Sequence, residues 1–321
     1  MPRSSPNRKH LNAFARRGLE AVFWIVFALA LAVGGPGALD GLPGLGDLVV
    51  PAAVFEAQAS GQARDQTVSI PLLIARIKEP AQTIEPVQSH LPAIAIVIDD
   101  MGGDPVQNRR AIALPRAVSL SFLPDPPDTP SLSREAKAAG HEILAHVPMQ
   151  APTHDGSSVM ALRTDVSADE NIRRLDWALM RVRGYAGINN HEGSVFTANR
   201  QALVPVDEAL YGRGIFFLDS RTTPLSQVVP VSRAFGVPSA ARDVFLDDDE
   251  APEAIAAQLR LLEQTARANG VAIAIGHPHA TTLDVLSRWC RTHPGLRLVP
   301  VSLAIRLKTE REMGVKVASS E

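Results

Sequence analysis

The sequence predicts an α/β protein whose main domain is a distorted parallel barrel of seven or eight strands. Two observations predict this fold class: short apolar runs alternate with segments of helical spacing, and polar residues follow the apolar runs at their carboxyl ends. Strands that alternate with helices form parallel sheets. In a parallel barrel the carboxyl ends of the strands meet on one face, where the active site lies, so these polar residues should converge there.

The first strand carries the clearest clue to chemistry. Its apolar run, 93–98, follows Pro92 and ends in Asp99 and Asp100, just before glycines at 102 and 103. A β-branched run of this length is typical of a buried parallel strand, and the glycines permit a sharp turn beside the acids. Asp100 could instead serve only as a cap for the turn or helix that follows. The ends of the other strands favour a functional role.

Five further apolar runs also end in polar residues that could bind a metal or move a proton. Adding the runs 117–122 and 296–299 gives up to eight strands between residues 93 and 307, a span below the roughly 250 residues of a typical barrel. The five runs are 142–145 before His146, 185–188 before Asn189, Asn190 and His191, 215–218 before Asp219 and Arg221, 244–246 before Asp247, and 271–275 before His277.

Segments with helical spacing lie between the strands. Ser167, with Glu170 three residues later, is a capping-box signature, and Gly270 is placed to end a helix predicted over 250–269. Apolar residues recur three or four positions apart, as expected of a helix that buries one face. These residues are Ile172, Leu175, Leu179 and Val182 in the first segment and Ile255, Leu259 and Leu262 in the second.

The composition fits one catalytic domain with appendages. The chain has 321 residues, of which 45% are hydrophobic, and a formal net charge of -2, so it can bury a large core. Because the chain has no excess of positive charge, it lacks the electrostatic footprint of a nucleic-acid-binding protein, and we expect no nucleic-acid partner. The single cysteine, Cys290, cannot form a disulfide within the chain and is interpreted as a small core residue.

The amino-terminal segment predicts a membrane anchor. Basic residues precede an apolar stretch over 21–33, the order of the n-region and h-region of a signal sequence, and no small-x-small cleavage site follows closely. We therefore expect an uncleaved signal anchor of a single-pass inner-membrane protein, with its positive charges in the cytoplasm and the catalytic domain in the periplasm. The basic residues are Arg3, Arg8, Lys9, Arg16 and Arg17.

These features divide the chain into five parts. We predict a basic cytoplasmic amino terminus over 1–18, a signal anchor or transmembrane helix over 19–35, a flexible linker over 36–91, the β/α barrel over 92–307 and a carboxyl-terminal tail over 308–321. The linker, rich in Gly, Pro, Ala and Gln, would space the barrel from the membrane.

Six ordered motifs give the chain a resemblance to a known family. The stretch 92–307 contains IVIDDMGGD, HEILAHVPMQ, GINNHEGSVFT, FFLDSRTT, DVFLDDD and AIAIGHPHATTLDVL. With these motifs it resembles the divergent polysaccharide deacetylases, distant relatives of the NodB-type carbohydrate deacetylases. The resemblance implies a distorted β/α barrel of the glycoside hydrolase/deacetylase type and metal-dependent hydrolysis of N-acetyl or O-acetyl groups on a glycan. It also implies that Asp99 is the general base, Asp100 a metal ligand and His277 the general acid.

The second motif departs from the NodB-type pattern, in which two ligand histidines stand four residues apart. Here His141 and His146 are five apart and bracket a strand. At about 3.3 Å per residue they would lie roughly 16 Å apart, too far to share one ion. We therefore keep His146, at the carboxyl end of its strand, and replace His141 by His191. His141 is expected to be a surface or strand-start residue, and His191 could still be an ordinary loop histidine.

The expected site is thus a divalent metal held by Asp100, His146 and His191, with open positions for water and substrate. Zn²⁺ is the expected ion, with Co²⁺ or Mn²⁺ as alternatives. Residues at neighbouring strand ends are expected to orient the site or contact substrate: Asp219 and Asp247 beside His277 or the ligands, Arg221 beside Asp99 or a sugar substituent, and Asn190 near the metal.

The expected function is removal of acetyl groups from a cell-envelope or extracellular polysaccharide. Two alternatives remain open. The altered second motif would also fit a catalytically inactive carbohydrate-binding or regulatory protein on the same fold. A carboxylate pair such as Asp99 and Asp219 would also fit a glycosidase.

Overall fold

The computed structural model describes residues 91–153, 158–292 and 295–313. The expected cytoplasmic segment 1–18, anchor 19–35 and nearly all of the linker 36–91 lie outside the described residues. No helix within the described ranges has the length and apolar character needed to cross a membrane.

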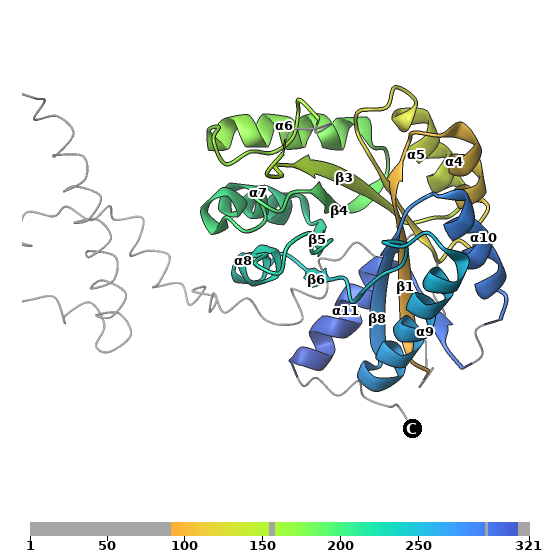
Figure 1. The fold of residues 1–321 in the computed structure, drawn as a ribbon. Coiled ribbons are helices and arrows are strands. Elements are labelled where there is room, and N and C mark those ends of the chain that lie inside the picture. Colours follow the sequence, from red (N-terminus) through yellow and green to blue (C-terminus); the bar gives the residue numbers. More distant parts are fainter. Residues whose placement is uncertain (1–90, 154–157, 293–294, 314–321) are drawn as a thin grey trace, which may run out of the picture. The chain divides into compact units, whose positions relative to one another are not determined.

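The described residues form one curled parallel sheet flanked by helices (Figure 1). Its order is β6-β5-β4-β3-β2-β1-β8-β7, and β9 pairs with β1. The strands are β1 (Ala93–Met101), β2 (Ser119–Phe122), β3 (Ile143–Met149), β4 (Tyr185–Glu192), β5 (Phe216–Asp219), β6 (Ser239–Ala241), β7 (Val244–Phe245), β8 (Val271–Gly276) and β9 (Arg297–Leu298).

Helices connect most of the strands, as the alternating pattern predicts. They are α4 (Pro105–Ile112), α5 (Thr129–Ala138), α6 (Ala168–Arg181), α7 (Arg200–Arg213), α8 (Val228–Ala234), α9 (Pro252–Asn269), α10 (Ala280–Trp289) and α11 (Val301–Glu312). The predicted helix signals are confirmed at two places. The Ser167 hydroxyl accepts a hydrogen bond from Glu170 N at the start of α6, and Gly270 ends α9 with a φ of 74°.

The sheet curls into a half-barrel, which is more open than the expected distorted barrel of seven or eight strands. Its two edges are β6 and β7, which Arg242 and Asp243 join directly in sequence, yet no backbone pairing links them in the described chain. Instead Arg242 N donates to Asp219 O, on the β5 side, and Asp243 N donates to Ile273 O, on the β8 side. The chain therefore crosses the opening at these two residues. Strand β6 has no counterpart among the predicted strands.

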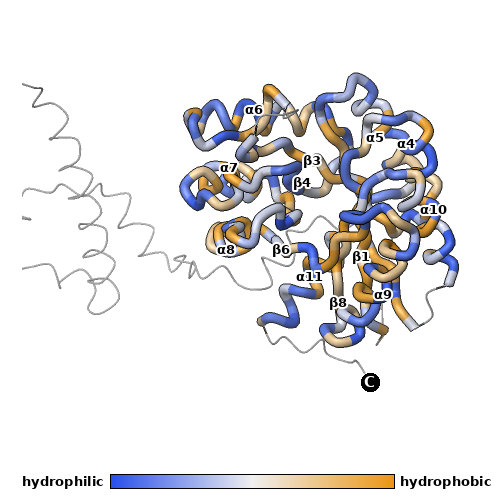
Figure 2. The backbone as a smooth tube through the Cα atoms, in the orientation of Figure 1, coloured by the Kyte–Doolittle hydropathy of each residue, from blue (hydrophilic) through white to orange (hydrophobic). Residues whose placement is uncertain are grey.

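The two faces of the sheet follow the two-residue alternation of strand side chains. On β1, Ile94, Ile96 and Ile98 pack in the core beneath the surrounding helices, whereas Ala93, Ala95 and Val97 belong to a second core that contains α11. Figure 2 shows apolar positions along β1 and β8, which are covered on both faces. Helix α11 thus covers the inner face, and it continues to Glu312, beyond the predicted domain end at residue 307.

Helix α11 begins without a side-chain cap of its own, because Pro300 is its N-cap residue. The sheet supplies the missing acceptors. Ser119 Oγ accepts a hydrogen bond from Val301 N at 3.1 Å, and Glu142 Oε2 accepts one from Ser302 N at 2.9 Å. These bonds fix α11 at the amino ends of β2 and β3. The opposite, carboxyl ends of the strands remain available for a site.

Candidate active site

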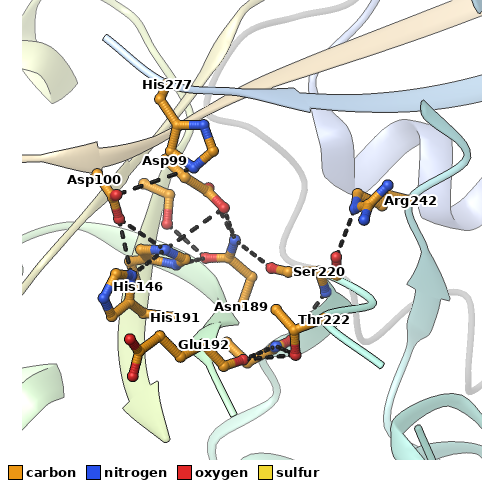
Figure 3. Close-up of polar contacts among 12 residues, drawn as sticks. Asp99, Asp100, His146, Asn189, His191, Glu192, Ser220, Thr222, Arg242 and His277 are labelled. Atoms are coloured by element: carbon orange, nitrogen blue, oxygen red, sulfur yellow. Dashed lines mark hydrogen bonds and ion pairs between the residues drawn. The ribbon is translucent and has the colours of Figure 1, made fainter. Parts of the chain in front are cut away.

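Polar side chains from four strands converge at the carboxyl ends of the sheet (Figure 3). Asp99 continues the inner-face alternation of Val97, and simple alternation would send Asp100 to the other face. Asp100 instead has a left-handed backbone with a φ of 53°, and the pairing of β1 with β2 shifts register between Ile98 and Met101. This irregularity lets two consecutive carboxylates face one site. A strained backbone of this kind is typical of functional positions.

Three potential ligand atoms form a tight triangle. Asp100 Oδ1 lies 3.2 Å from His146 Nε2 and 2.9 Å from His191 Nδ1, and the two imidazole nitrogens are 3.2 Å apart. Atoms bound to one tetrahedral Zn²⁺ at about 2.0–2.1 Å would lie roughly 3.3 Å apart. The donor set and its spacing therefore fit a divalent metal. The predicted ligands Asp100, His146 and His191 are brought together.

The charges around the triangle also fit a cation. Burial acts to lower the pKa of His146, but the carboxylates of Asp99 and Asp100 raise it above its ordinary value. Burial would raise the pKa of Asp100, but hydrogen bonding with His146 and His191 holds that pKa well below its usual range. Carboxylates that favour positive charge on His146 also favour a metal cation beside it.

Asn189, which the sequence analysis did not assign, supports the triangle from behind. His146 Nδ1 donates to Asn189 Oδ1 at 3.0 Å, which leaves the Nε2 lone pair of His146 facing the other ligand atoms. The Asn189 amide nitrogen donates to both carboxylate oxygens of Asp99 at 2.9 Å.

Asp99 is buried beside the triangle and its carboxylate lies 3.6 Å from His146 Nε2. Burial raises the pKa of Asp99, although the neighbouring charges of His146 and His277 oppose the shift. A desolvated carboxylate with a raised pKa, next to a metal-binding triangle, is suited to accept a proton.

His277 faces the same site from the end of β8. Its Nε2 lies 4.0 Å from Asp100 Oδ2, and its Nδ1 lies 3.0 Å from Asp247 Oδ1. Burial acts to lower the pKa of His277, but the hydrogen bond to Asp247 and the charge of Asp99 outweigh it and raise the pKa to about 9. His277 is thus held in its protonated form, as a proton donor requires.

A second group of possible ligands comprises Asp247, His277 and His279. The Asp247 carboxylate is already engaged, because Oδ2 accepts hydrogen bonds from His277 N at 2.6 Å and from Thr282 Oγ1 at 2.9 Å. His279 is exposed beside Glu250. These contacts indicate an acid-orienting pair of Asp247 and His277 rather than a second metal site. The expected position of Asp247 beside His277 is found.

Asn190, Asp219 and Arg221, the other residues predicted near the site, make different contacts from those expected. Asn190 accepts a hydrogen bond from Ser220 N at 2.9 Å and donates to Glu192 O at 2.7 Å, so it braces the ends of β4 and β5. Asp219 accepts from Arg221 N within its own turn, and burial raises the pKa of Asp219. Arg221 was expected beside Asp99 or a sugar substituent, but no contact described for the Asp99 carboxylate involves Arg221.

Several contacting residues were not predicted, although one signal was present in the sequence. On β4, Gly187, Asn189 and His191 alternate along one face, so Asn189 shares the face of the predicted ligand His191, whereas Asn190 does not. The remaining unpredicted residues, brought in from separate elements, are Ser121, Ser220, Arg242 and Thr282.

His141 does not join the site, in agreement with its exclusion as a ligand, but it is not a surface residue. It is buried, and its two ring nitrogens lie 2.8 Å from Val118 O and 2.9 Å from Ile112 O. Of the two expected placements, the surface one is therefore wrong, whereas His141 does lie just before the start of β3 at Ile143. The carbonyl groups of Val118, just before β2, and of Ile112, at the end of α4, supply the polar partners that allow the imidazole to be buried.

Comparison with known proteins agrees with the motifs. The model of the divergent polysaccharide deacetylase family matches residues 96–305. The uncharacterized protein YibQ of Escherichia coli strain K12 is 37% identical over 210 residues, which are 65% of this chain and 66% of YibQ, so the match spans just under two thirds of that relative. An uncharacterized protein of Haemophilus influenzae is 36% identical over 201 residues, 63% of this chain and 72% of its own length.

A solved structure shares the fold. The uncharacterized protein ATU2773 from Agrobacterium tumefaciens C58 superposes with a TM-score of 0.65 at 29% identity, covering 68% of this chain and 90% of that protein. The family match and this superposition confirm the resemblance and the curled β/α architecture.

Proposed function

Because the chain belongs to the divergent polysaccharide deacetylase family, we propose that it is a metal-dependent hydrolase that removes acetyl groups from a cell-envelope or extracellular polysaccharide. The observation that carries this proposal is the convergence of Asp100, His146 and His191 beside a buried carboxylate, Asp99, and an oriented imidazole, His277. A metal triangle, a base and an acid are the three parts that metal-assisted hydrolysis of an acetyl group uses.

Asp100, His146 and His191 would hold one divalent ion, with Zn²⁺ expected from the two-His, one-Asp donor set and Co²⁺ or Mn²⁺ as alternatives. The ion would polarise the acetyl carbonyl and lower the pKa of a water molecule. Asp99 accepts the proton of the attacking water. The hydrogen bonds from Asn189 keep the Asp99 carboxylate oriented for that transfer.

His277 protonates the leaving amine or hydroxyl. Its Nδ1 is committed to Asp247, so Nε2 is the nitrogen that faces the site and gives up its proton. The raised pKa keeps this proton in place at neutral pH. The Asp247 carboxylate then stabilises the protonated ring before transfer, in the manner of an Asp–His pair.

The test combines metal analysis with acetate release from acetylated glycans. The purified protein should bind about one zinc per chain, and Ala substitution of Asp100, His146 or His191 should remove metal and activity while the fold is retained. Asp99→Asn and His277→Ala should keep the metal and lose acetate release by a factor on the order of 10² to 10⁴. Stoichiometric metal in all three ligand variants would refute the ligand set.

The same experiment separates the alternatives. A carbohydrate-binding or regulatory protein would be favoured if the wild-type protein bound metal but released no acetate, and if Asp99→Asn and His277→Ala still bound glycan almost normally. Release of reducing ends without acetate would favour a glycosidase.

We also propose that the protein is anchored in the inner membrane by residues 19–35, with its catalytic domain in the periplasm, where an envelope polysaccharide is accessible. The support is the basic block before residue 21, which the positive-inside rule keeps in the cytoplasm. A phosphatase reporter fused after residue 321 should be active. An inactive phosphatase together with an active cytoplasmic reporter at the same position would contradict this topology.

A further inference from the structure

Asn189 lies between the proposed metal ligand and the proposed base. The side chain is fully buried. Its oxygen accepts hydrogen bonds from His146 Nδ1 at 3.0 Å and from Ser121 Oγ at 2.6 Å. Its nitrogen donates to both Asp99 carboxylate oxygens at 2.9 Å and to Ser220 Oγ at 3.1 Å. Figure 3 shows Asn189 between His146 on one side and Ser220 on the other.

The two ends of the amide have different partners, and the partners fix its orientation. Asp99 as a carboxylate only accepts hydrogen bonds, so it requires the NH₂ end of Asn189. The opposite orientation would place the amide oxygen against the carboxylate of Asp99. His146, whose Nε2 faces the ligand triangle, carries its proton on Nδ1 and requires the oxygen end. Only one orientation of the amide serves both neighbours.

The chemistry of these contacts explains why an amide stands here. A histidine ligand is commonly supported by a carboxylate, which accepts the hydrogen bond from its second nitrogen. At this position a carboxylate would face Asp99 and repel it, because two carboxylates in contact cannot both remain ionised without cost. A hydroxyl is too short to span both neighbours. An asparagine accepts on one side and donates on the other without adding charge.

We propose that Asn189 is a positioning residue that joins metal retention to proton transfer: its oxygen end orients His146 as a ligand, and its nitrogen end orients Asp99 as the base. This inference rests on the proposed hydrolytic function. Ser121 on β2 and Ser220 after β5 add one hydrogen bond each to the amide, whose orientation Asp99 and His146 determine.

Two substitutions separate the two ends of the amide. Asn189→Asp keeps an acceptor for His146 but replaces the donor to Asp99 with a carboxylate that repels it, whereas Asn189→Ala loses both contacts. Zinc affinity, measured on the purified full-length protein by competition with a chromogenic chelator, should fall about 10- to 100-fold in Asn189→Ala and stay within a few-fold of wild type in Asn189→Asp. Acetate release, measured as kcat, should fall strongly in both variants with little change in KM.

A double-mutant cycle with Asp99→Asn tests whether the effect on kcat passes through Asp99. In the Asp99→Asn background, Asn189→Ala should lower the residual kcat little further and still weaken zinc binding. Ser121→Ala is the matched control, since it removes one hydrogen bond to the same Asn189 oxygen but none of the hydrogen bonds described for His146 or Asp99. It should change both measurements far less than Asn189→Ala does. Circular dichroism confirms that each variant is folded, and Asn189→Asp carries the test if Asn189→Ala does not fold.

Two results would overturn the inference. One is wild-type zinc affinity in a folded Asn189→Ala variant, and the other is equal loss of zinc by Asn189→Asp and Asn189→Ala. A wild-type protein that binds zinc but releases no acetate from any glycan would refute the proposed function instead, and the zinc measurements would then decide the role of Asn189 at His146 alone.

Discussion

The Asp247 carboxylate holds His277 at two points. One oxygen lies 3.0 Å from the ring Nδ1 and the other accepts the backbone N–H of His277 at 2.6 Å. Thr282 Oγ1 donates to that second oxygen at 2.9 Å and keeps the carboxylate from turning. The side chain of Asp247 is completely buried, so this pairing is shielded from water.

Asp247→Asn should therefore move the pH profile of acetate release. As the proposed acid, His277 would act in its protonated form, so activity should be lost as pH rises through its pKa, which Asp247 helps to raise to about 9. Without the negative charge the pKa of His277 falls, and the alkaline limb should shift to lower pH, with a loss of kcat on the order of 10² at neutral pH. Thr282→Val, which leaves the charge in place, should shift the limb much less. An unmoved limb in Asp247→Asn would show that His277 is not the acid.

His141 provides the control for the choice of metal ligands. Because His141 contacts two backbone carbonyl groups in the core, His141→Ala should lower the free energy of unfolding by about 1–3 kcal/mol and leave the zinc content unchanged. His146→Ala should instead lose the bound zinc. Urea unfolding and elemental analysis of the same preparations measure both effects. Loss of zinc from a normally stable His141→Ala variant would contradict the assignment.

Glu142 should stabilise the fold through α11. Glu142→Ala leaves Ser302 N without the acceptor at the start of that helix, so the free energy of unfolding should fall by about 1–3 kcal/mol. Glu142→Gln keeps an acceptor for Ser302 N. Burial raises the pKa of Glu142, and the neutral Gln side chain avoids the cost of burying a charge. The Gln variant should be clearly more stable than the Ala variant in urea unfolding. Equal losses would show that the contact with α11 is not what Glu142 contributes.

Asp207 should make stability depend on pH. It is buried on α7, where its carboxyl accepts a hydrogen bond from Ser232, and burial raises its pKa to about 7 from an ordinary value of 3.8. Since the folded state holds this proton more tightly than the unfolded chain, its contribution to stability is full below about pH 4 and is lost as pH rises toward 7, at about 1.4 kcal/mol per pH unit.

Asp207→Asn keeps a neutral side chain of similar shape and should remove that slope. The stability of the variant relative to wild type should therefore increase as pH rises between about 4 and 7, measured by urea unfolding at several pH values. A difference that stays constant over this range would mean that Asp207 does not retain its proton in the folded state.

The site illustrates what strand periodicity predicts and where it stops. Asp100, His146 and His191 could be chosen from the sequence because each ends a different apolar run, and parallel strands bring such ends together. Asn189 was missed beside Asn190, although the alternation of Gly187, Asn189 and His191 marked the correct residue. The two carboxylates could share one face only because Asp100 takes a left-handed backbone, which the alternation of strand side chains does not predict.

By itself, the sequence determined the strand and helix alternation, the family and the strand ends that form the candidate site, because these depend on hydrophobic period and on residues adjacent in the chain. Tertiary structure alone decided that the sheet stays open between β6 and β7, that α11 fills the inner face through Ser119 and Glu142, and that His141 is buried. Each of these depends on contacts between residues far apart in sequence, whose partners supply the hydrogen bonds that burial demands. The local sequence does not identify such distant partners.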